Sequence, residues 1–77
     1  MDIKAFIEIF ADQFEDACAD DFTPETIYRE VEGWTSLVAL TVLAMIDEEF
    51  DVQLKGEEMK KATTIQQLFD LIQSKLD

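Results

Sequence analysis

The chain has 77 residues, of which 18 are acidic and six are basic, so its formal net charge is −12. This charge repels nucleic acids and anionic membranes and favours partner proteins with basic surfaces, although it also serves solubility alone. The chain has no histidine, which removes the commonest general base and the commonest zinc ligand.

The composition also limits the class of fold and the compartment. Hydrophobic residues make up 48% of the chain, with two glycines and one proline, which indicates a compact helical domain and not a disordered tail. The single cysteine, Cys18, cannot form an internal disulfide. The N-terminus does not have the pattern of a signal peptide, and the longest apolar run, from Leu37 to Ile46, is far shorter than the ~20 residues of a membrane span. We therefore expect a cytoplasmic monomer with no membrane span.

The first helix is predicted from about Asp2 to Asp16. Its apolar residues recur every three or four positions, which is typical of a helix that buries one face. These residues are Ile3, Phe6, Ile7, Phe10 and Phe14. Most of the charged residues between them fall on the opposite face, which we expect to be exposed to solvent.

From Ala17 to Gly33 the sequence has no helical period. Pro24 disfavours helix at the residue before it, while Thr23 can cap a single helical turn that begins at Pro24 and ends at Thr26. Three apolar residues are expected to pack beneath this segment, namely Ile27, Tyr28 and Val31. The prediction is a long first loop that its own apolar side chains hold against the helices.

A second helix is predicted to begin at Thr35 or Ser36 and to end near Phe50 or Asp51. Nearly every residue from Leu37 to Ile46 is apolar, so this helix is either central to the bundle or uses one face for something other than the core. The residues expected in the core are Leu40, Val42, Leu43, Met45, Ile46 and Phe50. The acids that follow lie near the helix C-terminus, where the helix dipole disfavours them, and this indicates either a binding role or a solvated face.

The C-terminal part is predicted to hold a short and a long helix. Val52 to Gly56 is read as an extended link, and Glu57 to Lys61 as about one helical turn. The last helix begins at Thr64, which with Gln67 has the spacing of a capping box. Its expected buried face is Ile65, Leu68, Phe69, Ile72 and Leu76. The expected fold class is all-α, with three main helices plus one short helix and a long first loop.

Ser36 stands where a turn is predicted to become a helix. A serine at this place is most often an N-cap, whose hydroxyl accepts a hydrogen bond from the second or third N–H of the helix. If Thr35 is the cap, Ser36 takes the first helical position and its hydroxyl faces outward. A helix start also favours a phosphate group, and no histidine or nearby lysine can activate the hydroxyl. Any covalent chemistry at Ser36 must therefore be performed by another protein.

Several spaced features together resemble the acyl carrier protein family over essentially the whole chain. Ser36-Leu37 matches the end of the family's Asp-Ser-Leu triplet at the start of the second helix, and Gly33-Trp34 looks like the Trp-Asp-Ser-Leu variant of many stand-alone carriers. The segment from Met45 to Phe50 is similar to the acidic end of the family's second helix. The segment from Ala62 to Leu68 resembles the threonine-rich start of the family's last helix.

The resemblance implies an acyl-carrier-like four-helix bundle in which residues 1–77 form a single acyl carrier domain that is not an enzyme. It implies that a phosphopantetheinyl transferase attaches 4′-phosphopantetheine from coenzyme A to Ser36. The arm then carries acyl or aminoacyl groups as thioesters between enzymes of fatty acid, polyketide or nonribosomal peptide biosynthesis, which are expected to have basic patches. The residues expected to contact these partners are Thr35, Leu37, Val38, Thr41, Asp47, Glu48 and Glu49.

One alternative is a carrier-like helical interaction module that is never modified. Thr35 stands where the family usually has an aspartate that helps the transferase engage its carrier, and Val38 and Thr41 occupy a stretch where the family often has acids. These departures indicate specialised partners, and they keep the unmodified module open.

A second alternative is a calcium-responsive protein. Asp47, Glu49, Asp51 and Glu58 fall at positions one, three, five and twelve of a possible calcium loop. Val52 stands at position six, where such a loop needs glycine for its sharp turn. We therefore disfavour this alternative and expect no metal site.

Overall fold

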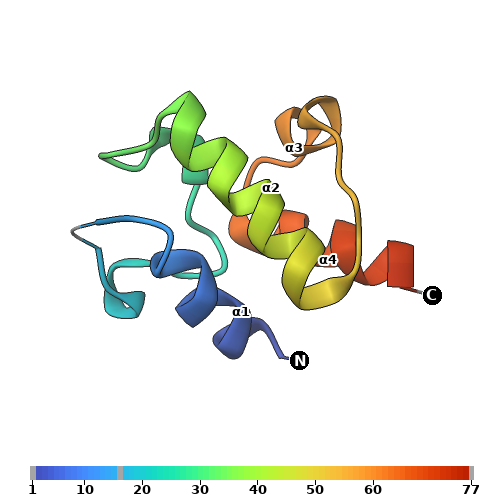
Figure 1. The fold of residues 1–77 in the computed structure, drawn as a ribbon. Coiled ribbons are helices and arrows are strands. Elements are labelled where there is room, and N and C mark those ends of the chain that lie inside the picture. Colours follow the sequence, from blue (N-terminus) through green and yellow to red (C-terminus); the bar gives the residue numbers. More distant parts are fainter. Residues whose placement is uncertain (1, 16, 77) are drawn as a thin grey trace.

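The computed structural model describes residues 2–15 and 17–76, and most of them lie in four α-helices (Figure 1). The helices are α1 (Ile3–Ala11), α2 (Ser36–Phe50), α3 (Gly56–Lys61) and α4 (Ile65–Leu76). Two short 3₁₀ turns, η1 (Ala19–Asp21) and η2 (Tyr28–Glu30), lie in the long connection between α1 and α2. No described residue belongs to a β-strand, so the all-α prediction is confirmed.

An aromatic cluster joins α1 to the other helices in one hydrophobic core. The Phe6 ring of α1 lies 5.3 Å from the Phe69 ring of α4 and 5.8 Å from the Phe50 ring of α2, measured between ring centroids. Phe6 and Phe10 are fully buried, as is Tyr28 of the first loop. Contacts of this kind add to the stabilisation that comes from burying the ring surfaces themselves. The core therefore extends from α1 to α2, α4 and the first loop.

The first helix ends five residues before its predicted end. It begins as expected after Asp2, whose carboxylate accepts a hydrogen bond of 2.8 Å from the Ala5 N–H. It ends at Ala11, and the Gln13 side chain donates to the Ile9 carbonyl, one of those left without a helical partner. Phe14 is still buried, because a turn directs it against Phe22. The apolar spacing thus predicted correctly that Phe14 is in the core, but it did not predict where the helix ends. Asp16, the predicted last residue, lies outside the described residues.

The first loop is fastened to the start of α4. The N–H groups of Ile65 and Gln66 donate to the carbonyls of Thr26 and Pro24, at 3.1 and 2.9 Å. The loop thus provides acceptors for N–H groups that a helix start leaves unpaired. The segment predicted as a helical turn after Thr23 is a hydrogen-bonded turn and not a helix.

One loop residue expected in the core lies outside it. Tyr28 is buried and Val31 is half-buried, as predicted, whereas 40% of Ile27 is exposed. Ile27 forms an isolated antiparallel bridge with Thr64, and its backbone is extended. Ile27 is the extended residue directly before the 3₁₀ turn η2, and it is Tyr28, the first residue of that turn, that enters the core.

The C-terminal helices follow the predicted pattern with one exception. The Thr64 side chain accepts a hydrogen bond from the Gln67 N–H, and the Gln67 side chain accepts from the Thr64 N–H, which confirms the capping box. Four of the five predicted core residues of α4 are buried, whereas Leu76 is 49% exposed. Leu76 lies in the last turn of α4, where the helix runs past the edge of the core.

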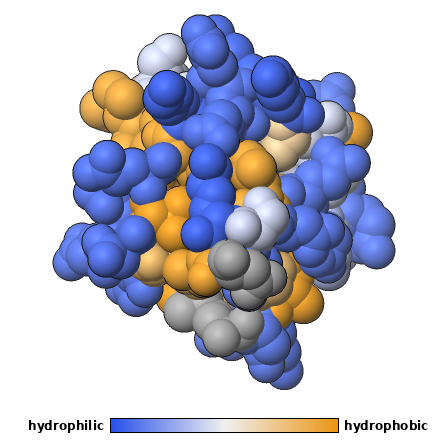
Figure 2. All heavy atoms as spheres, turned by 90° about the vertical axis from the view of Figure 1, so that its right-hand side faces the viewer, coloured by the Kyte–Doolittle hydropathy of each residue, from blue (hydrophilic) through white to orange (hydrophobic). Residues whose placement is uncertain are grey.

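Charged and polar side chains occupy the surface. Among the described residues, the Tyr28 hydroxyl, which donates to the Ala62 carbonyl, is the one polar side-chain group of a fully buried residue, and no charged side chain is buried. On the face toward the right of Figure 1, hydrophilic side chains surround a group of apolar ones (Figure 2). Within the described ranges, no helix has both the length and the apolar character that crossing a bilayer requires.

Candidate functional site

The start of α2 has a defined cap. Thr35 has an extended backbone, and its hydroxyl accepts a hydrogen bond of 3.1 Å from the Val38 N–H. Thr35 is therefore the N-cap, and Ser36 occupies the first helical position. Of the two roles that the sequence left open for Ser36, the structure excludes the cap.

The turn before Ser36 is anchored in the core. Gly33 has a φ angle of +95°, a conformation that glycine adopts at little cost. The half-buried Trp34 ring stacks on Phe10 with 6.5 Å between centroids and also lies 5.3 Å from the Tyr28 ring. Trp34 thus packs against the bundle, as the sequence suggested, and holds the turn that presents Ser36.

Ser36 is exposed, and no hydrogen bond links its hydroxyl to any other residue in the ranges that the structure describes. The first turn of α2 carries no acidic residue. The unpaired N–H groups and the positive end of the helix dipole face outward here, a favourable environment for a phosphate group. The chain has no histidine and α2 has no lysine, so Ser36 has no base beside it that would make it a catalytic nucleophile.

The predicted partner-contact residues form two groups on α2. Thr35 is the N-cap, and Leu37, Val38 and Thr41 lie within the first two turns. Leu37 is 73% exposed and Val38 is half-buried, while the Thr41 hydroxyl donates to the Leu37 carbonyl at 2.9 Å. The exposed acids Asp47, Glu48 and Glu49 lie further along, with Asp47 about 16 Å from Ser36 along the helix axis.

Leu40 was predicted in the core, and the structure contradicts this, because 63% of its surface is exposed. The core side of α2 consists of Val42, Met45 and Ile46, with Leu43 and Phe50 half-buried. The sequence of a helix that is apolar nearly all round does not reveal which face is buried, and the predicted buried face of α2 therefore wrongly included Leu40. Leu40 instead shares the exposed face with Leu37, three residues before it.

A groove of about 330 Å³ separates the end of α1 from α2. Its lining consists of Ile9, Asp12, Gln13, Thr41, Ala44, Met45, Glu48 and Glu49. The fold therefore brings Thr41, Glu48 and Glu49 together with Asp12 and does not bring Asp47 into the same groove. Asp12 could not have been recognised from the sequence, because only the packing of α1 against α2 places it there.

The possible calcium segment does not form a twelve-residue loop. Asp47 and Glu49 lie within α2, and Asp51 follows as its C-cap with a left-handed backbone. Within residues 2–15 and 17–76, no three or more histidine, cysteine, aspartate or glutamate side chains are grouped so that they could hold a metal ion.

Comparison with known proteins agrees with this architecture of a helical bundle that presents one serine at a helix start. The model of the family described as "phosphopantetheine attachment site" matches residues 4–72, so the chain belongs to this family. An acyl carrier protein of Chlorobium phaeobacteroides is 34% identical to the chain over 56 residues, which are 73% of this chain and 72% of that protein. Membership of this family implies a 4′-phosphopantetheine prosthetic group and partner enzymes such as the transferase that adds it.

The residues at the start of α2 fit such a group. The Ser36 hydroxyl is exposed, the neighbouring N–H groups and helix dipole favour a phosphate, and the first turn has no acid to repel it. Leu37 adds exposed apolar surface beside the hydroxyl.

Proposed function

We propose that the protein is a carrier without catalytic activity of its own, and that Ser36 is the residue that holds 4′-phosphopantetheine. The exposure of the Ser36 hydroxyl at the first helical position, with its capping role taken by Thr35, is the observation that carries this proposal. The prosthetic group supplies a thiol for acyl or aminoacyl thioesters, which pass between biosynthetic enzymes.

In this proposal, residues of the chain position Ser36 and bind the phosphate of the prosthetic group. Thr35 and Trp34 hold the turn so that Ser36 stays accessible, and the start of α2 stabilises the negative charge of a phosphate. We further propose that residues 1–77 form a single carrier domain, which acts as a monomer in the cytoplasm. Fatty acyl, polyketide and aminoacyl cargo all remain compatible with these residues.

The proposed docking surface for partner enzymes lies on α2. Exposed Leu37 and Leu40 offer an apolar contact near Ser36, and Asp47, Glu48 and Glu49 offer negative charge at the far end. A partner with a basic patch would complement this charge, and such charges mainly speed and orient encounters. Of the other predicted contact residues, Thr35 and Thr41 are exposed and Val38 is half-buried beside them.

The test is the intact mass before and after incubation with coenzyme A and a broad-specificity phosphopantetheinyl transferase. The wild type should gain one phosphopantetheine, and the Ser36→Ala variant should gain none. The matched control is Ser74→Ala, because Ser74 is the only other serine and is also exposed. Loading that persists in Ser36→Ala, or that is lost in Ser74→Ala, would contradict the assignment.

The same assay tests the docking surface. Leu37→Gln should lower the rate of loading, because it removes apolar contact area beside Ser36, and should leave the final mass unchanged. Leu76→Gln is the control, since Leu76 is an exposed leucine at the end of α4. Equal rates for the two variants would exclude Leu37 from the docking surface.

A second candidate function is an unmodified interaction module, which the threonine at position 35 favours. Thr35→Asp retains an oxygen that can cap α2 and introduces the acid that the transferase usually meets. If the wild type is never loaded while Thr35→Asp is loaded readily, the unmodified module is the better description.

A further inference from the structure

The charge of this acidic chain is unevenly distributed along the sequence. Residues 1–54 hold 14 of the 18 acids and two of the six basic residues, whereas residues 55–77 hold four acids and four basic residues. The first part therefore carries the whole formal net charge of −12, and the second part is neutral. Three of the basic residues belong to α3 or cap it, because Lys60 and Lys61 lie in its last turn and Lys55 is its N-cap.

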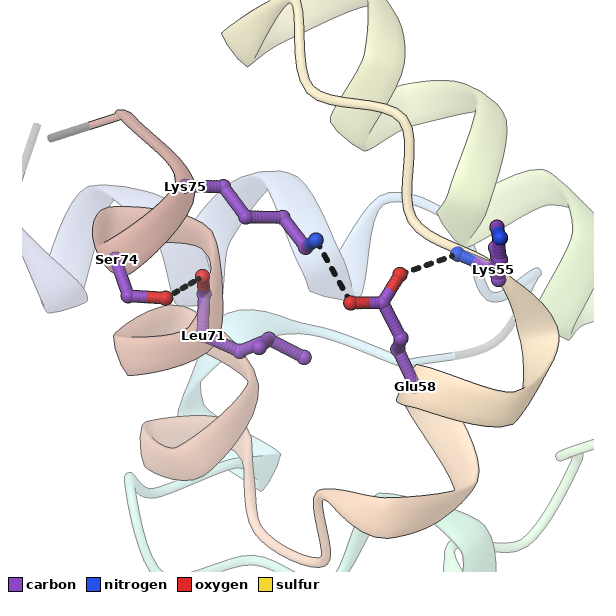
Figure 3. Close-up of polar contacts among 5 residues, drawn as sticks. All are labelled: Lys55, Glu58, Leu71, Ser74 and Lys75. Atoms are coloured by element: carbon purple, nitrogen blue, oxygen red, sulfur yellow. Dashed lines mark hydrogen bonds and ion pairs between the residues drawn. The ribbon is translucent and has the colours of Figure 1, made fainter.

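Two further basic side chains reach α3 from other segments. The Arg29 guanidinium of the first loop donates a hydrogen bond of 3.2 Å to the carbonyl of Ala62, the C-cap of α3. Lys75 of α4 forms an ion pair of 2.7 Å with Glu58 of α3 (Figure 3). Five of the six basic residues of the chain therefore adjoin one short helix.

The lysines of α3 keep their charge available at the surface. Lys55, Lys60 and Lys61 are exposed, and none of them forms an ion pair with any residue that the structure describes. Lys75 differs, because its ammonium group is already paired with Glu58. The side chains around α3 thus provide a basic surface on a molecule that is acidic elsewhere.

A groove of about 600 Å³ lies between α3 and α4 beside these lysines. Its lining consists of Glu58, Lys61, Ala62, Gln67, Asp70 and Leu71. Ala62 is buried and Leu71 is half-buried, so the groove has an apolar part. Leu71 points from α4 toward Glu58 of α3 (Figure 3).

The polar groups of the groove that remain available are mainly donors. The Asp70 carboxylate accepts a hydrogen bond of 2.9 Å from the Gln66 side chain. The side-chain oxygen of Gln67 accepts from the Thr63 N–H at 2.7 Å, which leaves the NH₂ group of this amide as its free end. Lys61 adds an unpaired ammonium group. An ammonium and an amide NH₂ beside apolar surface match a carboxylate that is flanked by an apolar side chain.

We propose that the groove between α3 and α4 is a docking surface for an acidic segment of a partner protein. A carboxylate of this segment pairs with Lys61, and a neighbouring apolar side chain of the segment packs against Ala62 and Leu71. The surface is separate from the one proposed on α2, and it does not depend on modification of Ser36.

The charge distribution favours a short acidic segment over other anionic occupants. A nucleic acid or an anionic membrane extends beyond the groove and would meet the field of the −12 net charge. A second copy of the chain would bring a further −12 and be repelled in the same way. A short segment places a few negative charges only at the neutral part of the molecule.

The test is a titration of the unmodified protein with the peptide acetyl-Glu-Phe-Glu-amide, followed by NMR of the backbone amides. The amides of Lys61, Gln67 and Leu71 should shift, whereas those of Leu37 and Leu40 on α2 should not. A peptide with lysines in place of both glutamates should leave the groove amides unchanged. A peptide with glycine in place of phenylalanine should bind more weakly, because it lacks the apolar contact.

Three variants distinguish a local contact from the overall charge. Lys61→Gln should raise the Kd of the acidic peptide about fivefold, as expected for an exposed ion pair. Lys4→Gln is the matched control, because it changes the net charge equally at an exposed position of α1 and should leave the Kd nearly unchanged. Asp70→Asn should lower the Kd, since it removes a like charge from the groove.

Four results would overturn the proposal. Groove amides that do not shift at millimolar peptide would exclude the docking surface, and equal losses in Lys61→Gln and Lys4→Gln would reduce it to net charge. Equal shifts with inorganic phosphate would mean a site for any small anion. Groove signals that shift with protein concentration in the absence of peptide would mean that a second copy of the chain occupies the groove.

Discussion

At the start of α2, Thr35 caps the helix and the neighbouring Ser36 is free for modification. The Thr35 hydroxyl is committed to the helix by its hydrogen bond from the Val38 N–H, while the adjacent Ser36 side chain is exposed. A single hydroxyl used for both purposes would lose the cap whenever it was modified. The arrangement therefore allows a group to be attached at Ser36 without a cost in helix stability.

This division predicts that substitutions at the two positions differ in their effect on stability. Thr35→Ala should lower the free energy of unfolding by about 1 kcal/mol, because it removes the N-cap, whereas Ser36→Ala should leave it nearly unchanged. Urea unfolding followed by circular dichroism measures both. Thr35→Asp, which can still cap the helix, is the control. A larger loss in Ser36→Ala than in Thr35→Ala would show that Ser36 is the cap in solution.

At the scale of elements, the helices differ in what holds them. α2 presents Val42, Met45 and Ile46 to the core while Leu37 and Leu40 face solvent, so it is both a core helix and an apolar surface. α3 instead depends on side chains of other segments, with Tyr28 of the first loop at one end and, at the other, Lys75 of α4, which pairs with Glu58 of α3. Long helices supply their own stability through buried area, whereas a six-residue helix cannot.

The attachment at Glu58 predicts a pH dependence of stability. The ion pair with Lys75, helped by the Lys55 N–H, holds the pKa of Glu58 below its usual value. The folded state therefore favours the carboxylate, and its contribution is present above the unfolded pKa and is lost as the pH falls through the folded pKa. Glu58→Gln should be less stable than the wild type at neutral pH, and the difference should vanish in acid.

Thermal unfolding between neutral pH and pH 3 measures this difference. The control is Glu57→Gln, which removes a neighbouring exposed carboxylate from the same turn of α3. If Glu57→Gln and Glu58→Gln have the same pH profile, the effect comes from general charge reduction and not from the Lys75 pair.

At the scale of the whole molecule, self-repulsion is the dominant electrostatic term. A net charge of −12 on a chain of 77 residues favours solubility and destabilises the compact state. Within the described residues, one ion pair, between Glu58 and Lys75, offsets this repulsion locally. The same field would attract a partner with a basic surface and orient its approach.

Added monovalent salt should therefore raise the melting temperature, because screening over about 8–10 Å weakens repulsion between surface carboxylates. Calorimetry in increasing sodium chloride measures the effect, and potassium chloride at equal ionic strength is the control for specific ion binding. A melting temperature that falls with salt would mean that attractive pairs outweigh the repulsion. A rise with sodium alone would indicate a bound ion.

The sequence by itself determined the helical class, the start of α2 at Thr35 or Ser36, the capping box at Thr64 and the buried faces of α1 and most of α4. These features depend on short-range rules, since caps and apolar spacing act within a few residues. The Trp-x-Ser-Leu variant stays a prediction. Tertiary structure alone decided the end of α1, the exposure of Ile27, Leu40 and Leu76, the groove that includes Asp12, and the hold of Tyr28 on α3. Each of these depends on which distant segment lies against the residue, and no local spacing carries that information.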